Sequence, residues 1–209
     1  MSAFSHTFSI CAYKQSEYLE ECILSLKKQT LPTRIIMVTS TPNDYIYSLA
    51  DKYEIPIFVR DGKSDIKDDW NFAYDRAETK WVTVAHQDDR YDPDYAAALA
   101  QKVGSMEHPI AFVTDYLPIK NGVIGPRDIN SRIRRLLRSP IKNERRAGSP
   151  FWKKQILAFG NSICAPSVTY NKEVLGPSFF TSEFKFNIDW DTFLKLAQID
   201  GQLAYVDRP

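Results

Sequence analysis

The sequence predicts an α/β protein of one domain, residues 1–209, with a mainly parallel central sheet flanked by helices on both faces. Short runs rich in β-branched and aromatic residues alternate with helical patterns, as in parallel sheets. One such run, residues 81–85, ends abruptly in polar and acidic residues, as a buried strand does where it opens into a ligand-binding crevice. A hairpin signal later in the chain adds a small antiparallel part to the second half.

Periodicity and capping residues place the elements of the first half. Residues 17–29 predict a helix because Leu19, Cys22, Ile23 and Leu26 share one apolar stripe. Asn43 or Asp44 is expected to cap a helix that reaches about Tyr53. Strands are further expected at 7–12, 34–39, 57–59, 81–85 and 110–115, and helices at 68–77 and from 93 to about 106.

The pattern changes after the fifth strand. Residues 119–124 predict a hairpin because Asn121-Gly122 suits a type I′ turn. A helix is expected in the following basic segment, with its apolar side chains on one face (Ile129, Ile133, Leu136 and Leu137). Strands at 167–170 and 202–206, with a helix from about 190 to 199 between them, complete the prediction.

Composition bounds the class of protein. The chain is 44% hydrophobic and 25% charged, which is ordinary for a globular protein, and it shows no secretory signal and no apolar run long enough to span a membrane. Three cysteines without a CxxC pair predict reduced thiols in a cytoplasmic protein. No GxGxxG or GxSxG motif occurs, and His6 and His108 are expected at the surface or in loops.

Charge is segregated along the chain. Residues 127–154 contain ten Lys or Arg and two acidic residues, a net of +8 in a chain whose net charge is +1. Such a block predicts an anionic partner. Nucleic acid is not expected, because the block lacks interleaved aromatic residues and the rest of the chain is acidic.

The candidate site begins after the strand at 81–85, in the residues His86, Gln87, Asp88 and Asp89. Two adjacent carboxylates repel each other unless a cation or ligand offsets their charge, so they favour a metal site. The alternative is that Asp88 and Asp89 cap the next helix, which has Pro93 near its first turn.

Four blocks of the sequence carry a resemblance to a known family: FSICAYKQSEYLEECILSLKKQT, DDWNFAYDRAETKWVTVAHQDDRYDPD, GNSICAPSVTYNKEVL and FNIDWDTFLKLA. Together they resemble the family-2 glycosyltransferases, which are inverting, have the GT-A fold and use nucleotide-activated sugars. They occur in the family's order over nearly the whole chain. The resemblance implies that residues 1–115 form a nucleotide-sugar-binding half and that residues 116–209 form an acceptor-binding half.

The same resemblance assigns roles to positions in the donor half. Residues implied to bind the nucleotide sugar are Ala12, Tyr13, Thr39, Ser40, Asn71, His86, Gln87, Asp88 and Asp89. Asp88 keeps the metal-ligand position for Mn²⁺ or Mg²⁺, while His86 replaces the usual first Asp. Thr39 and Ser40 stand where the family usually has acidic residues, for which Asp65, Asp68 or Asp69 could substitute.

In the acceptor half, Asp189 keeps the position of the catalytic base, although Ile188 replaces the usual Glu. Asn161 and Trp190 are implied to contact the ligands. A carboxylate at Asp189 would take the proton of the acceptor hydroxyl as the new bond forms. The alternatives are that Asp189 and Asp191 cap the last helix, that Asn161 is a turn residue, and that Trp190 is a core aromatic.

The expected function is therefore transfer of a sugar, with inversion and metal assistance, from a nucleotide-diphosphate donor, expected to be a UDP-sugar. The acceptor is a hydroxyl of a glycan, polysaccharide or lipid-linked saccharide, and polysaccharide biosynthesis is the expected process. For residues 127–154 there are three alternatives: a peripheral contact with the inner face of the membrane, a solvated helix, or a protein–protein surface. A homo-oligomer is compatible with the sequence. A non-catalytic glycosyltransferase-like scaffold subunit is the alternative function.

Overall fold

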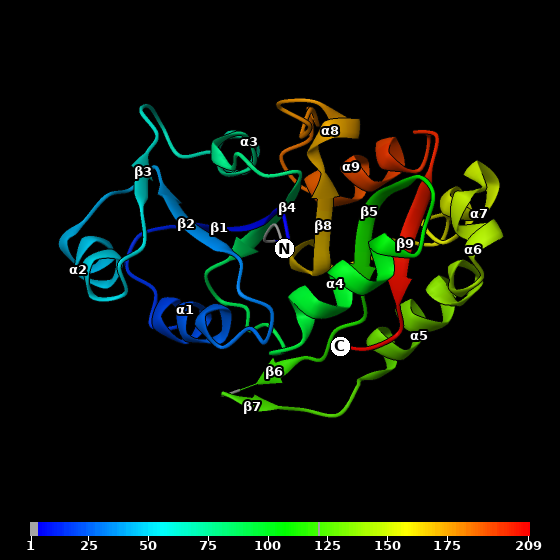
Figure 1. Ribbon diagram of the computed structural model, residues 1–209, viewed down its shortest axis with the longest axis horizontal. Coiled ribbons are helices and arrows are strands. Elements are labelled where there is room, and N and C mark those ends of the chain that lie inside the picture. The colour runs from blue at the N-terminus through cyan, green and yellow to red at the C-terminus, as the bar shows by residue number, and fades with distance from the viewer. Residues whose placement is uncertain (1–3, 121) are drawn as a thin grey trace. The chain divides into compact units, whose positions relative to one another are not determined.

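The computed structural model describes residues 4–120 and 122–209, which fall into two compact units. Unit 1 comprises the described residues up to Ala100 together with Tyr170–Thr181. Unit 2 comprises Gln101–Thr169 and Ser182–Pro209. Figure 1 traces the elements of both units from blue at the N-terminus to red at the C-terminus.

Unit 1 is built on four parallel strands in the spatial order β3-β2-β1-β4. Their bounds are β1 His6–Ala12, β2 Arg34–Thr39, β3 Ile57–Val59 and β4 Trp81–His86. The helices are α1 Leu19–Lys27, α2 Asp44–Lys52, α3 Ile66–Arg76 and α8 Lys172–Leu175, and α4 Tyr95–Gly104 crosses into unit 2. In the ladder, Cys11 is paired with His86 and Ala12 with Thr39, so the carboxyl ends of three strands meet at one edge.

Unit 2 contains the parallel pair β5 Pro109–Thr114 and β9 Gln202–Val206 and the antiparallel hairpin β6 Ile119–Lys120 and β7 Val123–Ile124. Its helices are α5 Ile129–Arg138, α6 Glu144–Gly148, α7 Pro150–Gln155 and α9 Ile188–Leu196, with short 3-10 helices η1 Ser139–Lys142 and η2 Ala165–Ser167. Asn121, half of the predicted turn, lies outside the described residues, whereas Gly122 has the positive φ of 74° that such a turn requires.

Strand β8 Val168–Asn171 begins in unit 2 and ends in unit 1. Across the described residues the large sheet has seven strands in the order β3-β2-β1-β4-β8-β5-β9. The predicted α/β class with a mostly parallel sheet and a small antiparallel hairpin is therefore confirmed. No described helix is long and apolar enough to cross a membrane.

The strands of the large sheet other than β3 contribute apolar side chains to a buried core. In unit 1, Phe8 and Ile10 of β1 are fully buried, as are Leu19, Cys22 and Ile23 of the predicted apolar stripe on α1. Asn43 caps α2 by accepting a hydrogen bond from the Ile46 backbone N–H, as expected.

His6 corrects one prediction, because it is 1% exposed inside β1 and is not a surface residue. A hydrogen bond of 2.8 Å joins its Nε2 to Thr83 Oγ1, and within the described residues its Nδ1 has no hydrogen-bond partner. Burial lowers the pKa of His6 to about 3, so the imidazole is neutral in the folded protein. The sequence did not reveal this, because a histidine at the start of a strand is equally compatible with a loop. His108 is exposed, as predicted.

We expect this buried histidine to make stability depend on pH. Its pKa in the folded protein is below the unfolded value of 6.5, so the unfolded chain binds a proton that the folded protein does not bind between pH 6.5 and about 3. The free energy of unfolding should therefore fall as pH falls through this range, by up to about 1.4 kcal/mol per pH unit from His6. Urea unfolding between pH 7 and pH 5 measures the slope.

The control is His6→Gln, whose amide can keep the hydrogen bond to Thr83 but does not titrate. Asp89 should instead make the free energy of unfolding rise as pH falls, since its pKa is raised to about 7. This contribution is the same in wild type and in His6→Gln. Subtracting the two profiles therefore isolates His6. Parallel profiles would show that His6 titrates normally in the folded protein.

Candidate active site

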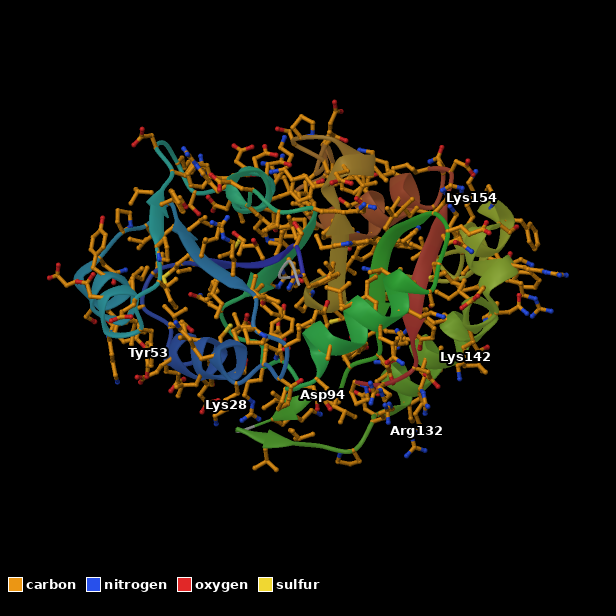
Figure 2. The ribbon with its side chains drawn as sticks, in the orientation of Figure 1. Lys28, Tyr53, Asp94, Arg132, Lys142 and Lys154 are labelled. Carbon is orange, nitrogen blue, oxygen red and sulfur yellow. The ribbon has the colours of Figure 1, made fainter. Side chains whose placement is uncertain are left out.

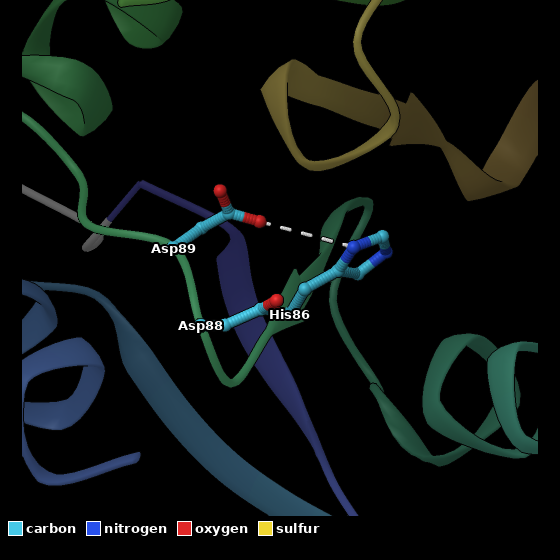
Figure 3. A group of neighbouring side chains, drawn as sticks. All are labelled: His86, Asp88 and Asp89. Carbon is cyan, nitrogen blue, oxygen red and sulfur yellow. Dashed lines mark ion pairs between the residues drawn. The ribbon is translucent and has the colours of Figure 1, made fainter. Parts of the chain in front are cut away.

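Three possible metal ligands lie at the carboxyl end of β4. His86 is the last residue of the strand, and a tight turn follows in which the Asp89 N–H donates to the His86 carbonyl at 3.2 Å. One ligand atom from each of His86, Asp88 and Asp89 lies within 4.8 Å of the others. Figure 3 shows the three side chains extending to the same side of this turn.

Charge is concentrated in this cluster. Partial burial, followed by the charge of Asp88, raises the pKa of Asp89 to about 7. His86 Nδ1 lies 3.8 Å from Asp89 Oδ2, and the imidazole stacks on Trp70 with ring centroids 5.0 Å apart. A divalent cation would offset the repulsion between the carboxylates, and an imidazole nitrogen with two carboxylates is a chemically suitable donor set.

Tyr13 and Gln87 connect the ends of β1 and β4. The Tyr13 N–H donates to Gln87 Oε1 at 2.9 Å, and Gln87 Nε2 donates to the Tyr13 carbonyl at 3.0 Å. The Tyr13 side chain is 44% exposed, whereas Ala12 before it is buried. These bonds hold the backbone after β1 beside the acidic turn, and they leave the phenol ring at the surface.

The end of β2 carries a polar network centred on Asp69. Ser40 Oγ donates to Asp69 Oδ2 at 3.0 Å, and Arg60 Nε pairs with Asp69 Oδ1 at 2.8 Å. Asp69 is thus the acidic residue beside Ser40, whereas Asp65 caps α3 and Asp68 is exposed. Thr39 is 3% exposed and its hydroxyl accepts from the Thr41 N–H.

Asn71 lies on α3, and both ends of its side-chain amide are bound to the Phe180 backbone. Nδ2 donates to the Phe180 carbonyl at 2.7 Å, and Oδ1 accepts from the Phe180 N–H at 2.9 Å. In this structure Asn71 therefore anchors the segment 170–181 within unit 1, and its contact with a nucleotide sugar stays a prediction.

Sequence reasoning did not assign a role to Arg60, and it did not predict that Trp70 stacks on His86. Arg60 directly follows β3, and its position after a parallel strand was a usable signal, the same one that pointed to His86. The stack of Trp70 on His86 had no such signal, because it joins a helix face to a strand end.

Unit 2 contains the predicted base at the start of α9. Asp189 Oδ2 accepts from Asn161 Nδ2 at 2.6 Å, and Asp189 Oδ1 accepts from the Trp190 N–H at 2.8 Å. Asn187, and not Asp189 or Asp191, occupies the N-cap position of α9, and its side chain makes no capping hydrogen bond. Trp190 Nε1 donates to the Leu157 carbonyl at 3.1 Å, and Asp191 pairs with Lys195 at 2.9 Å. Asn161 and Asp189, 28 residues apart in sequence, are thus in direct contact.

A buried ion pair supports the loop that carries Asn161. The Arg138 side chain is fully buried, pairs with Asp115 and donates to the carbonyl of Ser162. Asp115 also pairs with Arg127 at 2.6 Å. Because Ser162 follows Asn161, the pair helps to fix the residue that holds Asp189.

The sequence matches the family described as Glycosyl transferase family 2 over residues 7–169, and the chain belongs to this family. No curated protein matches it.

Solved structures with the same fold come from S. aureus, Pyrobaculum calidifontis and Mycobacterium tuberculosis. S. aureus TarS 1-349 in complex with UDP has a TM-score of 0.68 at 16% identity, covering 99% of this chain and 59% of that one. The Pyrobaculum calidifontis mannosyltransferase PcManGT with GDP-Man and Mn²⁺ has a TM-score of 0.64 at 16% identity, covering 98% and 55%. Glucosyl-3-phosphoglycerate synthase from Mycobacterium tuberculosis with Mn²⁺, UDP and phosphoglyceric acid has a TM-score of 0.59 at 12% identity, covering 99% and 69%. At these identities the likeness concerns the fold, and this chain spans about 59% of the TarS chain.

Proposed function

We propose that this protein transfers a sugar from a nucleotide-diphosphate donor to a hydroxyl acceptor with inversion of the anomeric centre. The observation that carries the proposal is the cluster of His86, Asp88 and Asp89 at the carboxyl end of β4, in a chain of glycosyl transferase family 2. Ligands in open α/β sheets bind at this end of the strands. The ends of β1 and β2 meet the same edge and would line the nucleotide pocket.

Asp88 would hold a divalent cation, with Asp89 and His86 beside it. The cation would neutralise charge on the departing diphosphate. Mn²⁺ fits the donor set better than Mg²⁺, because Mg²⁺ strongly prefers oxygen ligands and His86 offers nitrogen. A UDP-sugar is the proposed donor, since UDP is bound by two of the similar structures and GDP-Man by one. Asp69, bonded to Ser40, is the proposed acidic contact to the nucleoside.

Asp189 is the proposed base. As the acceptor oxygen attacks the anomeric carbon from the face opposite the diphosphate, its proton passes to the Asp189 carboxylate, and no covalent intermediate with the protein is needed. Hydrogen bonds from Asn161 and from the Trp190 N–H hold this carboxylate in one orientation. The proposed acceptor is a saccharide or lipid-linked saccharide in polysaccharide biosynthesis, reached at the inner face of the membrane through residues 127–154.

A non-catalytic scaffold subunit is the second candidate. The replacements His86 and Ile188 in otherwise acidic motif positions favour it, because the buried hydrocarbon side chain of Ile188 has no carboxylate and cannot act in place of Glu. Metal-dependent hydrolysis of a UDP-sugar without acceptor decides between the two. An active enzyme should release UDP slowly when Mn²⁺ is present, whereas a scaffold should release none with any nucleotide sugar.

We expect Asp88→Asn to abolish Mn²⁺-dependent binding of UDP and to leave the fold intact. Asp88 is exposed, so the change removes a charged ligand and little packing. Titration calorimetry with and without Mn²⁺ measures binding. In a thermal shift assay, wild type should gain about 2.7 kcal/mol of stability at a ligand concentration 100 times the dissociation constant, and the variant should gain none.

Asp51→Asn is the matched control, because Asp51 is an exposed aspartate of the same unit on α2. It should bind UDP and Mn²⁺ as wild type does. Equal binding by wild type and Asp88→Asn would show that the metal site lies elsewhere. Binding lost in both variants would point to a general effect of charge.

A further inference from the structure

Helix α5 turns its aliphatic side chains away from the protein. Ile129, Ile133 and Leu136 are 76%, 50% and 71% exposed, although their spacing places them on one face. The opposite face is buried through Ser131 and Arg138. An amphipathic helix of a globular protein normally buries its apolar stripe, so the orientation of α5 is the reverse of the usual one.

Ion pairs explain why the helix keeps this orientation. Arg138 reaches inward to Asp115, and Arg135 makes two bonds of 2.8 Å to the Asp207 carboxylate. Rotating α5 to bury its aliphatic residues would break these charged contacts and leave the buried Asp115 with only Arg127 as a partner, which is unfavourable. The apolar face is therefore held outward.

The β6–β7 hairpin adds to the same surface. Val123 and Ile124 are 67% and 59% exposed. Arg134 Nη1 on α5 donates to the hydroxyl of Tyr116, just before the hairpin, at 3.3 Å. Hydrogen bonds from Ser131 lower the pKa of Asp128 at the start of α5, and the charges of Lys120 and Arg134 lower it further, so the hairpin and the helix start are neighbours. Figure 1 shows the hairpin leading directly into α5.

Cations without a carboxylate partner border this surface. Arg132 and Arg134 are exposed, and in the part of the chain that the structure describes neither forms a salt bridge. Arg132 projects at the outer rim of α5 in Figure 2. By contrast, Arg127, Arg135, Arg138 and Lys142 pair with Asp115 and Asp207, so two carboxylates within the protein neutralise part of the positive charge of the basic segment. Of the arginines on α5, Arg135 and Arg138 are therefore already paired within the protein.

We propose that the outer face of α5 and the β6–β7 hairpin form a docking surface for an anionic phospholipid bilayer. The inference rests on the membrane contact proposed above and assigns it to specific side chains. Aliphatic residues bordered by arginines are the pattern by which a helix lies in a lipid interface, with its apolar face among the acyl chains and its cations at the phosphates. A large exposed apolar patch is otherwise unusual on a soluble protein.

Charge argues against a second copy of this chain as the occupant. A symmetric dimer brings the same patch together from both protomers. Helix α5 contains no acidic residue, and Asp128 at its start already accepts a hydrogen bond from the Ser131 N–H. Arg132 and Arg134 would then approach the arginines of the other protomer. An anionic lipid surface supplies the opposite charge.

Flotation of the full chain with vesicles tests the proposal, without nucleotide, metal or acceptor. Vesicles containing phosphatidylglycerol should bind the protein, and neutral phosphatidylcholine vesicles should bind it much less. Each arginine near an anionic leaflet contributes about fivefold in affinity, so Arg132→Gln with Arg134→Gln should weaken binding about 25-fold. Ile133→Ser with Leu136→Ser should lower binding by about tenfold per side chain, even at low salt.

Matched controls distinguish binding through this surface from a general effect of positive charge or of exposed apolar side chains. Arg145→Gln with Lys154→Gln removes two exposed cations of the same basic segment, and Phe151→Ser removes an exposed aromatic side chain of unit 2. Both should bind vesicles nearly as wild type does. An equal loss in the controls, equal binding to neutral vesicles, or a dimer in sedimentation analysis that Leu136→Ser dissociates would each overturn the proposal. UDP binding, measured separately, should be unchanged in all variants, so failure here is distinct from failure of the transferase proposal.

Discussion

Replacing Asp189 by Asn is expected to lower turnover by about 10²–10⁴-fold while donor affinity stays nearly unchanged. The amide cannot take the proton of the acceptor hydroxyl, but it has the size of the carboxylate and can keep a hydrogen bond to Asn161. The loss should therefore appear in kcat and not in the dissociation constant of the UDP-sugar. Steady-state kinetics and donor calorimetry on the same preparation measure the two quantities.

Asp191→Asn is the matched control, because Asp191 lies two residues further along α9 and pairs with Lys195 at 2.9 Å. It should keep nearly full turnover, since a pair on the helix surface contributes at most about 1 kcal/mol. Normal turnover in Asp189→Asn would remove Asp189 as the base. Equal losses in both variants would indicate a general effect on the start of α9.

The largest effect on stability is expected from Asp115→Asn. The Asp115 side chain is 1% exposed, and it is the carboxylate that faces the fully buried Arg138. The change leaves the guanidinium charge buried without its counterion, which should cost about 3–5 kcal/mol. For a chain of this size that corresponds to a fall in melting temperature of roughly 6–20 °C. Calorimetry or urea unfolding measures it.

Two further variants make this result specific. Glu144→Gln breaks the exposed pair with Lys102 and should cost no more than about 1 kcal/mol. Asp115→Leu combined with Arg138→Met removes both buried charges and should recover part of the lost stability. If Asp115→Asn were no more destabilising than Glu144→Gln, the Arg138 charge would have to be compensated by groups other than Asp115.

Local sequence pattern was sufficient for most elements of the fold. The stripe of Leu19, Cys22, Ile23 and Leu26 predicted α1, because apolar residues at this spacing lie on one face of a helix. All four side chains are buried in the structure. The end of β4 was equally clear, since a run of β-formers stopped at consecutive polar residues. Asp88 was indicated by the adjacent carboxylates at the strand end and again by resemblance of motifs, whereas the role of Asp189 came from resemblance alone, which carries information about chemistry that periodicity does not contain.

Contacts between distant segments could not be predicted in this way. The Asn161–Asp189 bond, the Asp69 network at the end of β2 and the stack of Trp70 on His86 each join residues that approach only after the chain folds. Asn71 illustrates the limit most directly, because nothing in the sequence indicated that its amide is bound at both ends to the Phe180 backbone.

Short-range periodicity, and the points where polar residues interrupt a strand, were enough to predict the α/β class, the strands, most of the longer helices and the acidic turn after β4, but not α6, α7 and α8. The burial of His6, the inward direction of Arg138 and the outward direction of the aliphatic face of α5 became visible only in the folded protein. The reason is energetic. A helix with one charged and one apolar face can bury either face. The charged face is buried when the core contains a counterion for it, as Asp115 is for Arg138 of α5.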